Sequence, residues 1–185
     1  MNKRNFVAVA VALMFGFSAL HASAQKDPMV GGAAMYPTKN IVENAVNSKD
    51  HTTLVAAVKA AGLVDTLEGA GPFTVFAPTN EAFAKLPAGT VDTLLKPENK
   101  QMLTTVLTYH VVPGRLTEAD IDAMIKQGGG KAMMKTVQGE ELTFERGAGH
   151  LFVIDAKGDK AEVTIPNVMQ SNGVIQVINR VLLPS

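Results

Sequence analysis

The 185-residue chain contains no cysteine and no tryptophan, and aromatic residues make up only 5% of it. The lack of cysteine excludes disulfide bonds, thiol chemistry and a lipid-modified N-terminal cysteine, so the fold must be held together by packing alone. Charged residues are also scarce, at 18%, and the formal net charge is zero. A chain without a basic excess is not expected to bind nucleic acid or an anionic membrane surface.

Long apolar runs are missing except near the N-terminus. Lys3 and Arg4 precede the apolar run Phe6–Leu20, which is shorter than the ~20 residues that a membrane-spanning helix needs. The small residues Ala22–Ala24 that follow match a secretory cleavage site. The sequence therefore predicts a signal peptide over residues 1–24, export to the periplasm or the medium, and no stable membrane insertion after cleavage. The alternative is an uncleaved N-terminal anchor.

The rest of the chain is expected to be one domain. Hydrophobic residues make up 46% of the sequence, which is typical of a globular protein. Without its first 24 residues the chain has 15 basic and 17 acidic residues, a net charge of −2. Pro28, Gly31, Gly32 and Pro37 mark residues 25–37 as a flexible linker. We therefore expect a single domain over residues 38–185, and no internal repeat is visible in it.

The segment Phe73–Phe83 predicts a strand that leads directly into a helix. Its first residues are apolar, β-branched or aromatic, and Pro78 cannot donate a ladder hydrogen bond, so the strand is expected to end there. Thr79 or Asn80 can then accept from the first free amides of a helix. A strand and a helix that present apolar residues to the same side indicate the centre of an α+β core.

The second half of the chain changes from helical to alternating periodicity. After a glycine run at 128–130, short segments of period two follow one another up to the end, which predicts a β-meander. Asn172-Gly173 is typical of a type I′ hairpin turn, so we expect Gly173 at positive φ. The run behind it, Val174–Leu183, is nearly all apolar, and we expect it to be covered on both faces.

Three segments together resemble the fasciclin-like (FAS1) domain family. They are Phe73–Phe83, the pair Tyr109-His110 and Asn172–Pro184, in this order, and the resemblance extends from about Ile41 to Pro184. It implies an α+β fold, a wedge-shaped β-sandwich core with several helices packed on it. It also implies an extracellular adhesion role without catalysis, with a cell-surface or matrix protein or a polysaccharide as partner and the chain as a monomer.

The sequence shows no pattern typical of a catalytic, cofactor or metal site. The segment Gly128–Lys131 lacks the first spaced glycine and the final Ser or Thr of a phosphate loop. The acidic segment Asp155–Glu162 lacks the order of a calcium loop and is expected to be a solvated turn. The histidines His51, His110 and His150 have no metal-binding spacing. We therefore predict no catalytic residues, no cofactor and no metal ligands.

The candidate partner-binding residues are implied by the resemblance. They are Tyr109, His110, Asn167, Val168 and Met169. For Tyr109 and His110 two interpretations stay open: a contact surface, or an imidazole bonded to the backbone that holds the strand in register. For Val168 and Met169 the alternative is strand packing. Asn167 stands where integrin-binding animal relatives have an aspartate, so this chain lacks the carboxylate for an integrin-bound cation.

Three function classes are compatible with the sequence. The first is a secreted or periplasmic module for adhesion and protein–protein association, which a filled core and an apolar surface patch would favour. The second is a carrier of a small apolar ligand in the cell envelope, which an apolar cavity with a few polar groups would favour. The third is an enzyme, which a perturbed acid–base pair in a cleft would favour. We predict the first.

Overall fold

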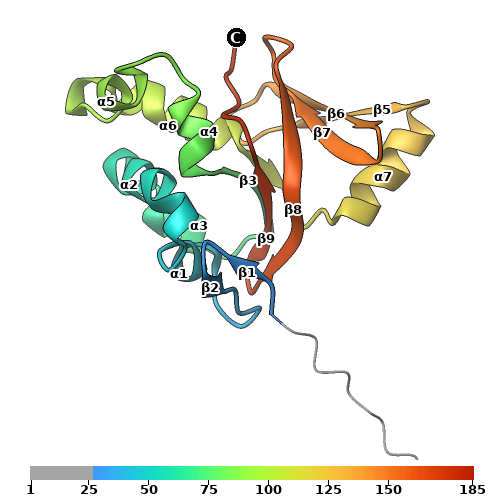
Figure 1. Ribbon diagram of the computed structural model, residues 1–185, viewed down its shortest axis with the longest axis horizontal. Coiled ribbons are helices and arrows are strands. Elements are labelled where there is room, and N and C mark those ends of the chain that lie inside the picture. Colours follow the sequence, from blue (N-terminus) through green and yellow to red (C-terminus); the bar gives the residue numbers. More distant parts are fainter. Residues whose placement is uncertain (1–26) are drawn as a thin grey trace, which may run out of the picture.

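The computed structural model describes residues 27–185, so the signal peptide predicted for residues 1–24 lies outside the described residues. A mixed sheet separates helices α1–α6 from α7 (Figure 1). The helices are α1 (Ile41–Ala45), α2 (Thr52–Ala61), α3 (Val64–Glu68), α4 (Asn80–Ala84), α5 (Thr90–Leu94), α6 (Lys100–Tyr109) and α7 (Glu118–Gln127), with 3₁₀ turns at Lys49–His51 and Pro97–Asn99. The strands are β1 (Met29–Val30), β2 (Ala33–Ala34), β3 (Phe73–Pro78), β4 (Val111–Pro113), β5 (Lys131–Lys135), β6 (Glu141–Gly147), β7 (His150–Ile154), β8 (Lys160–Gln170) and β9 (Gly173–Ile178). The α+β class expected from the sequence is confirmed.

The main sheet has seven strands in the order β4-β3-β9-β8-β7-β6-β5. Strands β5 to β9 form the predicted meander, and only β3 and β9 run parallel. The long strand β8 changes register between Val163 and Val168, around Pro166, which cannot donate to the ladder. The sheet folds over at this strand, and the amide of Val137, just after β5, donates to the carbonyl of Val111 in β4 at 2.8 Å. The two halves of the nearly closed sheet thus form the expected sandwich.

The fold has two hydrophobic cores, one on each face of β3 and β9. The helix–sheet core lies between helices α1–α6 and the outer face of these strands, to which Val75 and Ala77 contribute. The sandwich core lies inside the folded sheet and includes Phe76, whose ring centroid is 5.3 Å from that of Phe144. Every residue of β9 is buried, as its apolar sequence predicts. Alternation along one central strand therefore supplies both cores.

Polar side chains cap the N-terminal ends of helices α1, α4 and α7. The Thr79 hydroxyl accepts from the amide of Ala82 at the start of α4, as predicted. Thr117 and Asp120 form a reciprocal capping box at α7, and Asn40 forms one with Glu43 at α1. These caps fix the helix starts that surround the sheet.

The segment before the domain differs from the expected flexible linker. Residues 29–34 form the hairpin of β1 and β2, and Val30 of β1 and Met35, just after β2, are buried in the helix–sheet core. The carbonyl of Gly31 accepts from the amide of Lys49 at 3.1 Å, which ties the hairpin to the start of the second helix. Two buried apolar side chains and this bond explain why the described part of residues 25–37 is packed.

The expectation for Gly173 is wrong in its mechanism. Gly173 is not among the glycines at positive φ, and it opens β9 rather than sitting in the turn. A Cβ built on it would lie 2.1 Å from the carbonyl oxygen of Phe73 on the parallel strand β3. Glycine is required here because two backbones approach closely, not because the turn is left-handed.

Candidate functional site

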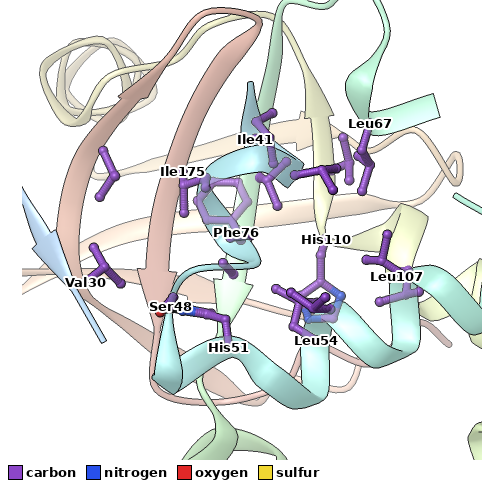
Figure 2. Close-up of a pocket in the computed structure, with 18 of the residues that line it drawn as sticks. Val30, Ile41, Ser48, His51, Leu54, Leu67, Phe76, Leu107, His110 and Ile175 are labelled. Atoms are coloured by element: carbon purple, nitrogen blue, oxygen red, sulfur yellow. Dashed lines mark hydrogen bonds between the residues drawn. The ribbon is translucent and has the colours of Figure 1, made fainter. Parts of the chain in front are cut away.

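A mostly apolar cavity of about 50 Å³ lies within the helix–sheet core. Figure 2 shows its lining, to which β9 contributes Ile175 and α2 contributes Leu54. Its polar side chains are confined to a few positions. Ser48 and His51 lie on one side of the cavity together with Val30, and His110 lies on the other side near Leu107.

The partly accessible lining residues mark where the cavity approaches the surface. Ala45 of α1, Val55 of α2 and Val64 of α3 are half-buried, and Lys59 of α2 is exposed. Since the aliphatic stem of a lysine covers apolar surface while its ammonium group stays in water, Lys59 is suited to the rim. The rim is therefore formed by residues of α1, α2 and α3.

The Ser48–His51 pair comes from the 3₁₀ turn that joins α1 to α2. The Ser48 hydroxyl lies 2.9 Å from His51 Nδ1, and both residues are buried. His51 Nε2 has no hydrogen-bond partner. Burial lowers the pKa of His51, and the carbonyl of Ala77 and the carboxylate of Asp50 oppose this only in part, so the imidazole is neutral at physiological pH.

His110 is equally buried but fully bonded. Its side chain is 3% exposed, Nδ1 lies 2.7 Å from the carbonyl oxygen of Val106, and Nε2 accepts from the amide of Leu182 at 2.9 Å. Burial lowers the pKa of His110 to about 4. The neutral ring thus links the end of α6 to the C-terminal segment, in agreement with the structural interpretation of this residue.

Tyr109 is buried in the sandwich core rather than the cavity. Its hydroxyl donates to the carbonyl of Glu141 at 3.1 Å and accepts from the amide of Ala156 at 2.9 Å. Burial raises the pKa of this phenol. The interpretation of Tyr109-His110 as a contact surface is therefore corrected: both side chains lie inside the molecule, where they cannot touch a partner in this conformation.

The segment from Asn167 to Met169 is only partly accessible. Asn167 is exposed at φ 58°, and its side-chain oxygen accepts from the amide of Glu118 at 2.7 Å, at the start of α7. Val168 is fully buried, pairs with Ile175 and lines the cavity, which agrees with strand packing. Met169 is partly exposed. Of the five candidates, the structure brings His110 and Val168 together, but at the wall of a cavity rather than on a surface.

The other positions considered for chemistry are structural in the described residues. Asp155, expected in a solvated turn, is buried and accepts from the amides of Lys157, Asp159 and Leu183 at 2.9 to 3.0 Å. His150 Nδ1 lies 2.7 Å from a carboxylate oxygen of Glu162 at the surface. Between residues 27 and 185, no three His, Asp or Glu side chains gather closely enough to hold a metal ion. None of the helices in this part of the chain is long and apolar enough to cross a bilayer.

Sequence reasoning missed the roles of three polar residues that the structure makes prominent. The sequence pattern indicates only a possible metal ligand at His51 and a turn at Ser48. The one signal that could have linked them is their spacing of three residues just before a helix. Asn172 was treated as a turn residue. Its side chain instead donates to the carbonyls of Leu67 and Gly69 at 2.7 and 3.0 Å and accepts from the amide of Ile41 at 3.1 Å, so it joins two helix ends to the sheet.

Comparison with known proteins identifies the family. The family model of the fasciclin domain matches residues 49–184. Protein sll1483 of Synechocystis is 49% identical over 88% of this chain and 83% of its own length. The cell surface glycolipoprotein MPB83 of Mycobacterium bovis is 33% identical over 88% of this chain and 63% of its own length. A solved FAS1 domain pair from the insect cell adhesion molecule Fasciclin I superposes with a TM-score of 0.70 at 20% identity, over 78% of this chain and 51% of that one, which supports the fold. The chain therefore belongs to the fasciclin domain family, a family of adhesion-type domains without a characteristic catalytic activity.

Proposed function

We propose that this protein is a non-catalytic interaction module, secreted or periplasmic, that binds a cell-surface or matrix protein or a polysaccharide. The proposal is supported by membership of the fasciclin family, by a mycobacterial relative that is a cell surface glycolipoprotein and by a structural neighbour that is a cell adhesion molecule. The module acts as a monomer and takes part in adhesion or envelope association.

The structural observation that supports this function best is a group of exposed apolar side chains at one end of the domain. Met29, Tyr36 and Val46 are 53%, 44% and 47% exposed, and we call them the hairpin face. Two contacts hold their segments together: Asn44 exchanges hydrogen bonds with the backbone of Tyr36, and Gly31 accepts from Lys49. Exposed aromatic and methionine side chains held on a rigid base are typical of interface cores.

Of the two accessible members of the earlier candidate segment, Met169 lies close to this face, whereas Asn167 bonds to the start of α7. Gln170 follows Met169 in the chain and accepts a hydrogen bond from Asn44, the residue that holds Tyr36. The end of β8 lies beside the hairpin of β1 and β2 (Figure 1). We therefore place the contact region on the hairpin face and extend it toward Met169, with the buried Val168 beneath that segment.

The test is binding of the labelled domain to cell-surface fractions of the native host. The double variant Met29→Ala with Tyr36→Ala is expected to lose at least tenfold in affinity, because truncating central interface side chains typically costs more than about 1 kcal/mol each. Met102→Ala is the matched control, because Met102 is 58% exposed on α6 and lies outside the hairpin face. Protease or glycosidase treatment of the fraction distinguishes a protein from a polysaccharide partner.

Circular dichroism and the denaturation midpoint must first show that the double variant is folded. Equal binding by the parent and the folded double variant would exclude the hairpin face as the contact region. A parent domain that shows no saturable binding to any fraction would contradict the adhesion function itself.

A further inference from the structure

The cavity in the helix–sheet core has the properties of a ligand site. Its volume is about 50 Å³, whereas a single buried water needs only about 10–15 Å³ on the same kind of measure. A buried water also needs two to four polar partners, and this cavity offers few because most of its walls are apolar side chains such as Val42, Leu54 and Ile175. The space therefore suits an apolar guest of a few non-hydrogen atoms better than it suits water.

One polar atom in the wall has no partner. Among residues 27–185, His51 Nε2 is the buried side-chain nitrogen or oxygen that makes no hydrogen bond, and the His51 side chain is only 3% exposed. The carbonyl of Ala77 lies near the ring but does not meet hydrogen-bond geometry. Buried polar groups in native proteins are nearly always bonded, and leaving one unbonded is costly. A guest that bonds to Nε2 would remove this cost.

The bond with Ser48 determines what Nε2 can offer. The buried Ser48 hydroxyl has a hydrogen to donate, and His51 Nδ1 lies within hydrogen-bond distance of it, at 2.9 Å. If the serine donates to Nδ1, the ring proton is on Nε2 and one donor is left free. The reverse arrangement would leave both the serine hydrogen and the Nε2 lone pair unsatisfied. The arrangement with fewer unsatisfied groups therefore makes His51 Nε2 a hydrogen-bond donor.

The other polar side chains around the cavity do not compete for this role. Both ring nitrogens of His110 are already bonded to the backbone. Lys59 is exposed at the rim, so its ammonium group stays in solvent. A carboxylate guest would have to leave water for a site whose imidazole is neutral, which is unfavourable.

We propose that the cavity binds a small, uncharged, mainly apolar molecule with a single oxygen acceptor, such as a ketone, an ether or an alcohol. The apolar part lies between α1, α2 and the outer face of β3 and β9, and the oxygen accepts from His51 Nε2. Entry is at the rim formed by residues of α1, α2 and α3. None of the three hairpin-face side chains lines this site, which gives the carrier function a defined place in the molecule.

The test uses 2-butanone as the probe and xenon as an apolar probe without a hydrogen-bonding group, in solution NMR of the full mature chain. Both are expected to shift the methyl signals of Val42, Leu54 and Ile175 in a saturable way. Only 2-butanone is expected to shift His51 Nε2, whose nitrogen signal should already show the protonated form without a guest. His51→Phe should weaken 2-butanone binding about fivefold to tenfold, as expected for the loss of one buried hydrogen bond, and leave xenon binding within about twofold.

His150→Phe is the matched control, because His150 is exposed on β7 and does not line the cavity; it should change neither affinity. If His51→Phe does not fold, the proposal is judged from the parent alone, by whether 2-butanone but not xenon shifts the His51 Nε2 signal. The proposal is overturned if neither probe shifts the cavity methyl signals, if 2-butanone binds His51→Phe as well as it binds the parent, or if a long-lived water stays on Nε2 at saturating 2-butanone.

Discussion

His51 and His110 line the same cavity and are each 3% exposed, yet their surroundings differ. His110 bonds to the backbone through both ring nitrogens, which join α6 to the C-terminal segment. His51 bonds only to Ser48 and keeps Nε2 free. A buried histidine with two backbone partners is part of the framework, whereas one with a free nitrogen beside an open space is available to a guest.

The two cores show the same contrast on a larger scale. In the sandwich core Phe76 and Phe144 are completely buried, and the hydroxyl of Tyr109 has both a donor and an acceptor partner. The helix–sheet core holds the cavity and the unpaired nitrogen. We infer that the sandwich core carries most of the rigidity, and that the helix layer on the other face is where the fold leaves room for binding.

A large effect is expected in the pH dependence of stability that His110 produces. Its pKa falls from the ordinary 6.5 to about 4 in the folded state, so the unfolded chain binds more protons between these values. Stability is therefore full above pH 6.5 and is lost as the pH falls toward 4, by about 3 kcal/mol in all. His51, whose pKa is also lowered, adds in the same direction.

Urea unfolding at a series of pH values, with imidazole NMR to assign the groups, checks this prediction. A His110 ring that titrates near 6.5 in the folded protein would contradict the assignment of His110 to the framework.

A smaller effect is expected at Gly173, which joins both cores at the start of β9. Gly173→Asn should lower the free energy of unfolding by about 1–3 kcal/mol, because the new Cβ would meet the backbone of Phe73. Asparagine tolerates a left-handed turn conformation. If Gly173 were in the type I′ turn expected from the sequence, Gly173→Asn would therefore lower the free energy of unfolding only slightly. The urea midpoint of this variant distinguishes the close backbone approach from the left-handed turn. An unchanged midpoint would support the assignment of Gly173 to the turn.

The last comparison adds one methylene group to a valine in each core and measures the change in stability. Val153→Ile in the filled sandwich core should cost about 1–3 kcal/mol, because overpacking forces side chains out of their preferred rotamers. Val58→Ile at the cavity wall should change stability by less than about 0.5 kcal/mol or raise it, because the cavity can take the extra methyl group. Equal losses from thermal unfolding of the two variants would mean that the helix–sheet core is as tightly filled as the sandwich core.

The sequence predicted the framework better than the site. Period-two alternation predicted strands β5 to β8, and the polar residue Thr79 predicted the start of α4, because these signals are local. Gly173 was assigned to a turn because the Asn-Gly pair has a strong local preference, but the parallel neighbour β3, almost a hundred residues away, determines why glycine is needed. The buried hairpin residues Val30 and Met35 were missed because glycines dominate the composition around them.

The cavity could not be predicted in the same way. Its walls come from nine helices and strands, and whether their side chains fill the space depends on how the helices pack on the sheet. These elements are β1, α1, α2, α3, β3, α6, β4, β8 and β9. The pair Tyr109-His110 was singled out through the family resemblance, and its hydrogen bonds now indicate a structural role. His51 carried no motif, and only its unpaired nitrogen distinguishes it from an ordinary core residue.

The contrast between the two histidines can be tested directly by replacing each with phenylalanine and measuring the free energy of unfolding. His110→Phe should lower it by about 2–5 kcal/mol, because the carbonyl of Val106 and the amide of Leu182 would each lose a buried partner. His51→Phe should change it by no more than about 1 kcal/mol, because the loss of the bond to Ser48 is offset by the removal of an unpaired buried nitrogen. Equal losses in the two variants, or a larger loss for His51→Phe, would contradict the assignment of His110 to the framework and His51 to the binding cavity.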